Sequence, residues 1–129
     1  MQTITFVTEI TASGADTRYI PVPARGNVHA VRVACDQAMV ATKTIIFSRS
    51  ATAVNTVTAP TGNTAAGTIL DGVPDTTNKG LIFDPDSSTV TDQVIKMVVL
   101  DAYTGSNGTL TVNIEFDDSA YVAQAASDA

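Results

Sequence analysis

Residues 93–117 constrain the fold more than any other part of the sequence. They read QVIKMVVLDAYTGSNGTLTVNIEFD, an apolar run followed by a Gly/Ser/Asn turn and then strict alternation of polar and apolar residues. Alternation with a period of two predicts a β-strand that buries one face and exposes the other. The face expected to be buried consists of Leu110, Val112, Ile114 and Phe116. Because the glycines at residues 105–108 permit a tight reversal, the segment predicts a β-hairpin.

The first strand of this predicted hairpin, residues 94–100, is apolar on both faces except at Lys96. Strands that are apolar on both faces are typical of the centre of a sheet that is covered on two sides. We therefore expect residues 94–100 to form a central strand with both faces covered.

Short alternating segments, separated by Gly, Pro, Asn and Asp turns, recur along the rest of the chain. The strands predicted from them are residues 3–10, 18–22, 28–35, 42–49, 54–57, 68–70 and 78–84. Since Pro21 cannot donate to a ladder, residues 18–22 are expected at a sheet edge. With about eight short strands and no convincing amphipathic helix, the chain is predicted to be all-β, an antiparallel two-sheet sandwich that is jelly-roll-like. An immunoglobulin-like sandwich is the alternative.

A chain of 129 residues is long enough to bury a real core within one domain. We expect residues 1–118 to form a single β-sandwich domain. Residues 119–129 are small and polar, and we expect them to form a C-terminal tail, either a loose terminus or an arm that docks on a partner.

The only histidine and the only cysteine lie on the same predicted strand, residues 28–35. Alternation places His29 on one face with Val31, Val33 and Cys35, so we expect His29 at the rim of the core and Cys35 as a buried structural thiol. Six residues of strand separate the two by roughly 20 Å, which excludes a catalytic pair. One Cys and one His also cannot build a usual zinc site.

No motif for catalysis or cofactor binding appears in the sequence. It has no G-x-S-x-G element, no Gly-rich phosphate loop and no Trp to stack on a sugar. The Asp-Pro-Asp-Ser-Ser run at residues 84–88, with Asp71, Asp75 or Asp92 nearby, offers oxygen ligands for calcium, but the same residues are ordinary turn formers. We therefore predict no enzymatic activity, no cofactor and no metal.

The charge of the chain bears on the partners that it can bind. With a net charge of −6 it lacks the basic face that nucleic acids and anionic membranes require, so neither is expected as a partner. The charge is uneven, because residues 1–50 carry five basic and three acidic side chains, whereas residues 51–129 carry two and ten. Such asymmetry can steer a subunit onto an oppositely charged protein surface, although it is also compatible with solvated charge that merely falls this way.

Cysteine usage and the first residues bear on the compartment. A single cysteine allows no internal disulfide, residues 3–10 already have the pattern of a strand rather than of a signal segment, and no apolar run approaches the roughly 20 residues that span a bilayer. We expect the chain to be made and folded in a reducing cytosol. Only 16% of its residues are charged, which favours either a surface that packs on other subunits or a plain Thr-rich sandwich.

Three segments carry a resemblance to a known group of proteins, namely MQTITFVTEI, TKTIIFSRSATAVNTVTAPTG and GTLTVNIEFDD. In these segments the chain resembles small virion proteins of tailed bacteriophages, and among them it is most similar to head decoration (capsid-cement) proteins. The resemblance implies a structural protein, often a homotrimer, that binds the major capsid protein lattice on the capsid exterior of the virion after synthesis in the host cytoplasm. A phage tail or head-fibre component and a carbohydrate-binding sandwich module are the alternatives.

Four arginines are candidates for contacts with such a partner, because Arg forms bidentate pairs with carboxylates. These possible partner-docking residues are Arg18, Arg25, Arg32 and Arg49. The alternative for Arg32 and Arg49 is an ordinary position on the solvent-facing side of a strand.

Overall fold

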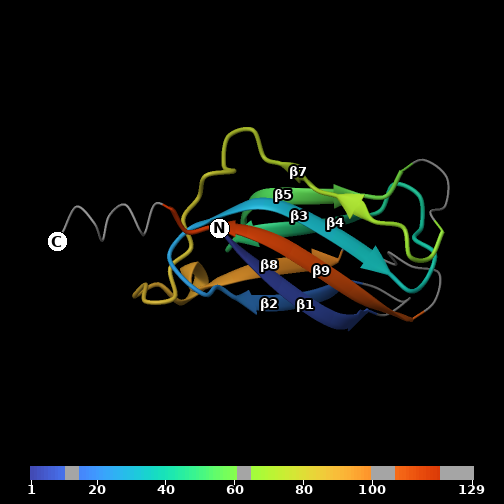
Figure 1. Ribbon diagram of the computed structural model, residues 1–129, viewed down its shortest axis with the longest axis horizontal. Coiled ribbons are helices and arrows are strands. Elements are labelled where there is room, and N and C mark those ends of the chain that lie inside the picture. Colours follow the sequence, from blue (N-terminus) through green and yellow to red (C-terminus); the bar gives the residue numbers. More distant parts are fainter. Residues whose placement is uncertain (11–14, 61–64, 100–106, 120–129) are drawn as a thin grey trace.

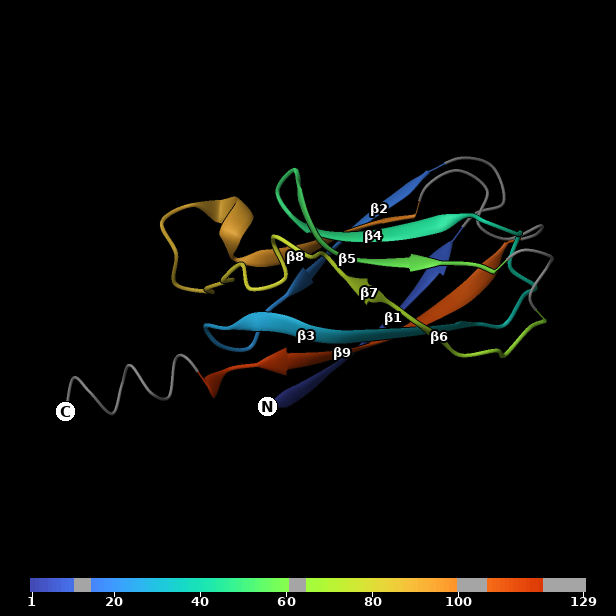
Figure 2. The ribbon, with the colours of Figure 1, turned by 90° about the horizontal axis from the view of Figure 1, so that it is seen from above.

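A computed structural model describes residues 1–10, 15–60, 65–99 and 107–119 of the chain. Its described part contains nine strands and one turn of 3₁₀ helix, arranged in two sheets that pack face to face (Figures 1 and 2). The elements are β1 (Gln2–Ile10), β2 (Asp16–Pro21), β3 (Asn27–Cys35), β4 (Thr44–Arg49), β5 (Thr52–Thr58), β6 (Leu70–Asp71), β7 (Val73–Pro74), η1 (Val90–Asp92), β8 (Val94–Val99) and β9 (Gly108–Asp117). The prediction of an all-β antiparallel sandwich is confirmed.

The strand order is that of a jelly roll. The four-stranded sheet has the order β1-β9-β3-β6, and the five-stranded sheet has the order β2-β8-β4-β5-β7. The antiparallel pairs β1/β9, β2/β8, β3/β6 and β4/β5 are therefore nested, from the ends of the described chain to its middle. Such a ribbon of nested pairs, rolled up so that successive pairs lie in alternate sheets, gives two packed sheets with Greek-key connections.

The predicted hairpin is wrong, because its two strands lie in different sheets. β8 pairs with β2 and β4, whereas β9 pairs with β1 and β3. The connection between them includes residues 100–106, which lie outside the described residues. Alternation along a strand specifies which face is buried, and it does not specify which strand lies alongside. β8 and β9 lie in different layers of the sandwich (Figure 2), and each buries the face that it turns toward the other sheet.

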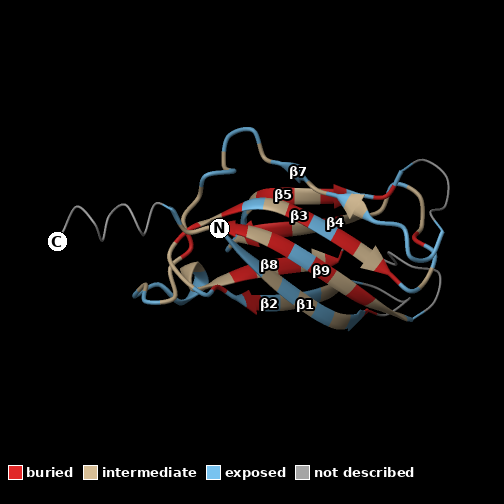
Figure 3. Cartoon of the chain, viewed as in Figure 1, coloured by how far each residue is buried: buried red, intermediate tan, exposed pale blue. Residues whose placement is uncertain are grey.

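The core lies between the sheets and is built by alternate residues of each strand, as Figure 3 shows along β9. β9 contributes the four predicted side chains, and β8 contributes Ile95, Met97 and Val99, all of which are buried. On β4, Ile45 and Phe47 share the buried face. Full burial of one such side chain stabilises the fold by about 1.5–3 kcal/mol, so the shared inward face of these strands fixes their register.

A β-bulge corrects the prediction for His29. The register of β3 against β9 passes from Val28↔Phe116 to Ala30↔Glu115, so His29 is the extra residue. The bulge reverses the alternation at this point, which leaves His29 exposed and Val28 buried. Beyond the bulge the prediction holds, since Val31, Val33 and Cys35 are buried.

The region between β5 and β8 differs most from the predicted strands. Residues 78–80 end a turn and residues 81–84 are irregular; their only ladder contact is an isolated bridge in which Gly26 and Phe83 exchange hydrogen bonds of 2.9 and 2.7 Å. Phe83 is nevertheless fully buried. The strand predicted at residues 68–70 is the two-residue β6, and β7 was not predicted because it contains Pro74, which a ladder tolerates only at an edge.

The sandwich is closed differently on its two sides. On one side Gly72 alone separates β6 from β7, so the chain passes directly from one sheet to the other. On the other side the edges are β1 and β2, and the prediction of an edge position for residues 18–22 is confirmed. No helix within the described ranges has the length and apolar character to cross a bilayer.

Candidate binding surface

The outer faces of the two sheets differ in chemistry. The four-stranded sheet presents polar side chains to water, among them Thr3, Thr5, Asn113 and Arg32. The five-stranded sheet presents Val94 and Val98 of β8, Ile46 of β4 and Tyr19 of β2, and none of these four is buried. Val98 lies opposite Ile46 and Tyr19 lies opposite Lys96 in the ladder. An outer face with this many apolar side chains is the stronger candidate for contact with a partner.

A groove opens on this face, and we call it the Tyr19 groove. Its volume is about 460 Å³, and its lining consists of Tyr19, Ser50, Val90, Thr91, Val94 and Lys96. Tyr19 is 60% exposed and Val90 is 71% exposed, and both lie at this groove. Exposed apolar residues are ordinary when isolated but informative when they gather in one place. Tyrosine is enriched in the centres of protein interfaces, where its ring is buried and its hydroxyl keeps a hydrogen bond.

Local structure fixes the walls of the Tyr19 groove. The backbone N–H of Asp84 donates to the carbonyl oxygen of Asp92 at 2.9 Å, which closes the loop that carries η1. Arg49 reaches the same region, because its Nη1 donates to the carbonyl oxygen of Ile82 at 2.9 Å and its Nε lies 3.6 Å from Asp92 Oδ1. The groove wall that contains Val90 is thus anchored to β4.

The groove also corrects the prediction for β8. β8 is an interior strand of its sheet, as expected, and its inward face is buried. Its other face was expected to be covered too, but Val94, Lys96 and Val98 are only partly buried by the described residues. The apolar residues on the second face were therefore the sequence signal for this surface, and the hairpin interpretation concealed it.

The four candidate docking arginines do not form one patch. Arg18 lies on β2 and Arg49 at the end of β4, where both are engaged within the chain. Arg32 lies on the outer face of the four-stranded sheet; its side chain is 57% exposed, and its Nε donates to Asp71 at 2.9 Å. Arg25 is half-buried in the turn before β3, and none of the ion pairs found among the described residues involves it.

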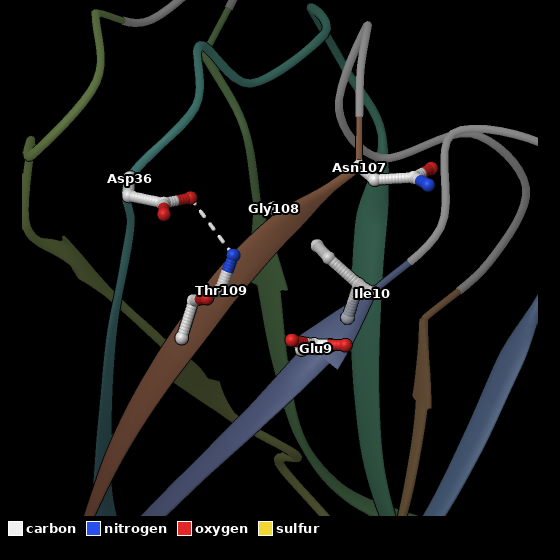
Figure 4. Close-up of a pocket in the computed structure, with 6 residues that line it drawn as sticks. All are labelled: Glu9, Ile10, Asp36, Asn107, Gly108 and Thr109. Carbon is white, nitrogen blue, oxygen red and sulfur yellow. Dashed lines mark hydrogen bonds between the residues drawn. The ribbon is translucent and has the colours of Figure 1, made fainter.

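A second hollow, of about 220 Å³, lies where β1 ends and β9 begins (Figure 4). The carboxylate of Asp36 points at β9 and accepts the Thr109 N–H at 2.8 Å, while the Asp36 N–H donates to the Thr109 carbonyl at 3.2 Å. Glu9 lies on the neighbouring strand, and the described lining contains no His, Cys, Lys or Arg. Of the two carboxylates at this hollow, that of Asp36 already accepts a hydrogen bond from the backbone of β9. This arrangement fits a structural link between β3 and β9 better than acid–base catalysis.

The remaining candidate groups are engaged in local structure. In the loop at residues 84–92, Asp84 Oδ1 accepts the Asp86 N–H at 2.9 Å and Ser87 Oγ accepts the Thr89 N–H at 3.1 Å, as expected for turn formers. Among the residues that the structure describes, no three His, Cys, Asp or Glu side chains converge as metal ligands. Cys35 is buried, and this desolvation raises the pKa of its thiol, which is the state of a structural rather than a reactive thiol.

Comparison of the chain with protein-family models, with curated proteins and with solved structures finds no match. The physical features of the surface therefore carry the functional interpretation.

Proposed function

We propose that the chain is a structural virion protein, a decoration protein of tailed-phage heads that binds the major capsid protein lattice on the capsid exterior and reinforces it. The single observation that carries the proposal is the Tyr19 groove, an anchored and apolar groove on the outer face of one sheet. Exposed apolar grooves of this kind mark sites of contact with other proteins. The resemblance in the sequence supplies the class of partner.

The surroundings of the groove suit contact with a protein surface. Lys96 lies at the groove beside Tyr19 and provides a cation for a carboxylate on the partner. Interfaces combine such an apolar centre with a charged rim, and the rim charges mainly set orientation and association rate. Arg25 and Arg32 remain the candidate arginines for further contacts. Arg32 is exposed and pairs only with exposed carboxylates, whereas Arg18 and Arg49 donate hydrogen bonds to backbone carbonyls within the chain.

In this proposal the protein has no enzymatic activity and no cofactor. It is synthesised in the host cytoplasm and acts once it has assembled on the phage head. The protein must be soluble and preformed before it docks. Burial of β8 and β9 against each other's sheet gives it a rigid scaffold, and the anchored loop at η1 presents Val90 without a folding step.

A carbohydrate-binding module is the second candidate, and one observation favours it. The ring of Tyr19 is exposed beside a groove, and aromatic rings on the face of a β-sandwich can stack on sugars. Tyr19 is the only tyrosine within the described ranges, whereas an extended sugar site needs several aromatic side chains. A phage tail or head-fibre component remains the third candidate, and the groove does not distinguish it from a decoration protein.

The test is co-sedimentation with emptied heads purified from the phage that encodes the chain, after this protein has been removed from them. We expect saturable binding and heads that withstand higher temperature when the protein is bound. Binding to a glycan array without binding to heads would instead assign the groove to sugars, and binding to tail fractions alone would assign the chain to the tail.

A further inference from the structure

Among the sheet edges that the described residues form, only β1 is both long and free of proline, lysine and bulges. The edges of the two sheets are β1, β2, β6 and β7. β6 and β7 are two residues each, and β2 ends in Pro21. β1 is nine residues long, contains no Pro or Lys, and keeps an unbroken register against β9. A long, regular edge of this kind is a template for pairing with another strand, and proteins usually protect it with a bulge, a proline or a lysine.

The backbone groups on the free edge of β1 can be identified. Thr109 on β9 exchanges hydrogen bonds with Asp36 after β3, so odd-numbered residues of β9 point their N–H and C=O groups toward β3. Even-numbered residues of β9 therefore point toward β1, where they pair with even-numbered residues such as Ile4 and Phe6. The odd-numbered residues of β1 point away from the sheet. In agreement, the carbonyl oxygen of Glu9 accepts a hydrogen bond of 3.0 Å from Arg18.

Arg18 therefore occupies the Glu9 end of the edge and leaves a free segment from Thr3 to Val7. This segment has three residues whose backbone groups face outward, which are Thr3, Thr5 and Val7. Within the described chain β1 pairs with β9 alone. The free segment is symmetric about Thr5, so a second copy can pair with it antiparallel, with Thr5 opposite Thr5 and Thr3 opposite Val7.

The side chains fit the same register. Ile4 and Phe6 point inward at the margin of the core and are only partly buried. In the antiparallel register centred on Thr5, Ile4 of one copy lies opposite Phe6 of the other, so both receive an apolar neighbour. On the outer face the exposed Val7 lies opposite Thr3. Glu9, the one charged side chain of β1, falls outside the paired segment, so no like charges face each other.

We propose that β1 pairs with β1 of a second copy about a two-fold axis through Thr5, which joins two four-stranded sheets into one continuous sheet. The strand that pairs with β1 belongs to a second copy of the chain. In this one register the backbone hydrogen-bonding groups, the apolar side chains and the charged side chains of β1 all complement those of another β1. The paired segment is short, and interfaces of small area are weak, so the dimer forms reversibly. The resemblance implies a trimer, which this two-fold contact does not produce by itself.

A charge swap at Thr5 tests the proposal, because this residue faces its own copy. Thr5→Lys and Thr5→Glu each place like charges directly opposite, and each is expected to raise the dissociation constant of the dimer about fivefold or more. An equimolar mixture of the two variants restores the dimer, since Lys then faces Glu. Thr58→Lys and Thr58→Glu are the matched controls, because Thr58 is an exposed strand threonine at the end of β5.

The measurement is sedimentation velocity from low micromolar to near-millimolar concentration, with circular dichroism to confirm folding. We expect wild type and the Thr58 variants to shift from monomer toward dimer, each Thr5 variant to shift only at concentrations about fivefold higher or more, and the mixture to dimerise like wild type. A wild type that stays monomeric at the highest concentration, or Thr5 variants that dimerise like wild type, would overturn the proposal.

Val7→Pro is a second variant, since it removes an edge N–H without removing a hydrogen bond to β9, and it should be monomeric. Head binding is measured separately, so failure of this inference leaves the proposed function standing.

Discussion

Arg18 Nη2 on β2 donates a hydrogen bond of 3.0 Å to the carbonyl oxygen of Glu9 on β1. The same guanidinium donates from Nε to Thr8 Oγ1 at 3.0 Å and from Nη1 to the Thr17 carbonyl at 3.0 Å. One side chain thus joins β1 and β2, the edge strands of the two sheets on this side of the sandwich. The planar guanidinium suits this position because its donors are fixed in direction.

Arg18→Ala is therefore expected to destabilise the fold by about 1–2 kcal/mol, because it leaves the Glu9 and Thr8 acceptors without their donor at a partly buried site. Arg18→Lys should recover only part of the loss, since a single ammonium cannot reach all three acceptors. Urea unfolding measures the change in the free energy of unfolding.

Arg32→Ala is the matched control, because Arg32 is more exposed and pairs with exposed Asp71. Its loss of unfolding free energy should stay within about 0.5 kcal/mol. Equal losses for the two alanine variants would contradict this role of Arg18.

The crossing at Gly72 gives a second prediction. A side chain at Gly72 would collide with the side-chain amide of Asn55, which is buried and has no hydrogen-bond partner among the described residues. Gly72→Ala should destabilise by about 1–3 kcal/mol through overpacking. Asn55→Ala removes both the obstacle and an unsatisfied buried amide, so the double variant should be more stable than Gly72→Ala alone.

A double-mutant cycle in urea measures this coupling. Gly80→Ala is the control, because nothing lies within 4 Å of a Cβ placed there, and it should leave stability unchanged. If the effects of Gly72→Ala and Asn55→Ala on the free energy of unfolding are additive, the expected steric clash between the two residues does not exist.

The pKa of Asp118 gives a third prediction. A hydrogen bond of 2.9 Å from the Gln2 amide and, next, the N-terminal ammonium hold the pKa of Asp118 below its ordinary value of 3.8. Gln2→Ala should therefore raise that pKa, as measured by NMR titration of the carboxyl carbon. Asp117 is the internal control, because the lowering of its pKa comes first from Ser119 and should persist.

The sign of the linked effect on stability follows. A carboxyl whose pKa is lower in the folded state stabilises the fold above its unfolded pKa, and this contribution is lost as pH falls through the folded pKa. The stability difference between wild type and Gln2→Ala should therefore be present at neutral pH and shrink below about pH 4. A difference that grew in acid would contradict the assigned interaction.

Alternation in the sequence predicted the buried faces well and the strand neighbours poorly. Val112 and Ile114 were placed inward correctly because hydrophobic burial acts on each strand locally. The partner of β9 could not be predicted in the same way, because a glycine-rich sequence such as that of residues 105–108 is compatible with a hairpin or with a passage to the opposite sheet. His29 was misplaced because a bulge shifts the alternation by one residue without a distinctive residue type.

The candidate site could be predicted only in part from the sequence. The arginines were chosen for their chemistry, but the structure shows two of them donating to backbone carbonyls within the chain. The Tyr19 groove depends on β2, β8 and η1 lying together, which is a tertiary relationship with no sequence motif. Its one signal was the apolar second face of β8.

The measurement that tests the account most directly is a binding titration of wild type, Tyr19→Ala and Val73→Ala on emptied phage heads. Tyr19 and Val73 are both exposed apolar residues of edge strands, but only Tyr19 lines the groove. Truncation of a central interface tyrosine commonly costs at least about 2 kcal/mol, so Tyr19→Ala should weaken head binding roughly 30-fold or more, with Val73→Ala close to wild type. Equal binding by all three proteins, or no binding by wild type, would contradict the proposed function of the groove.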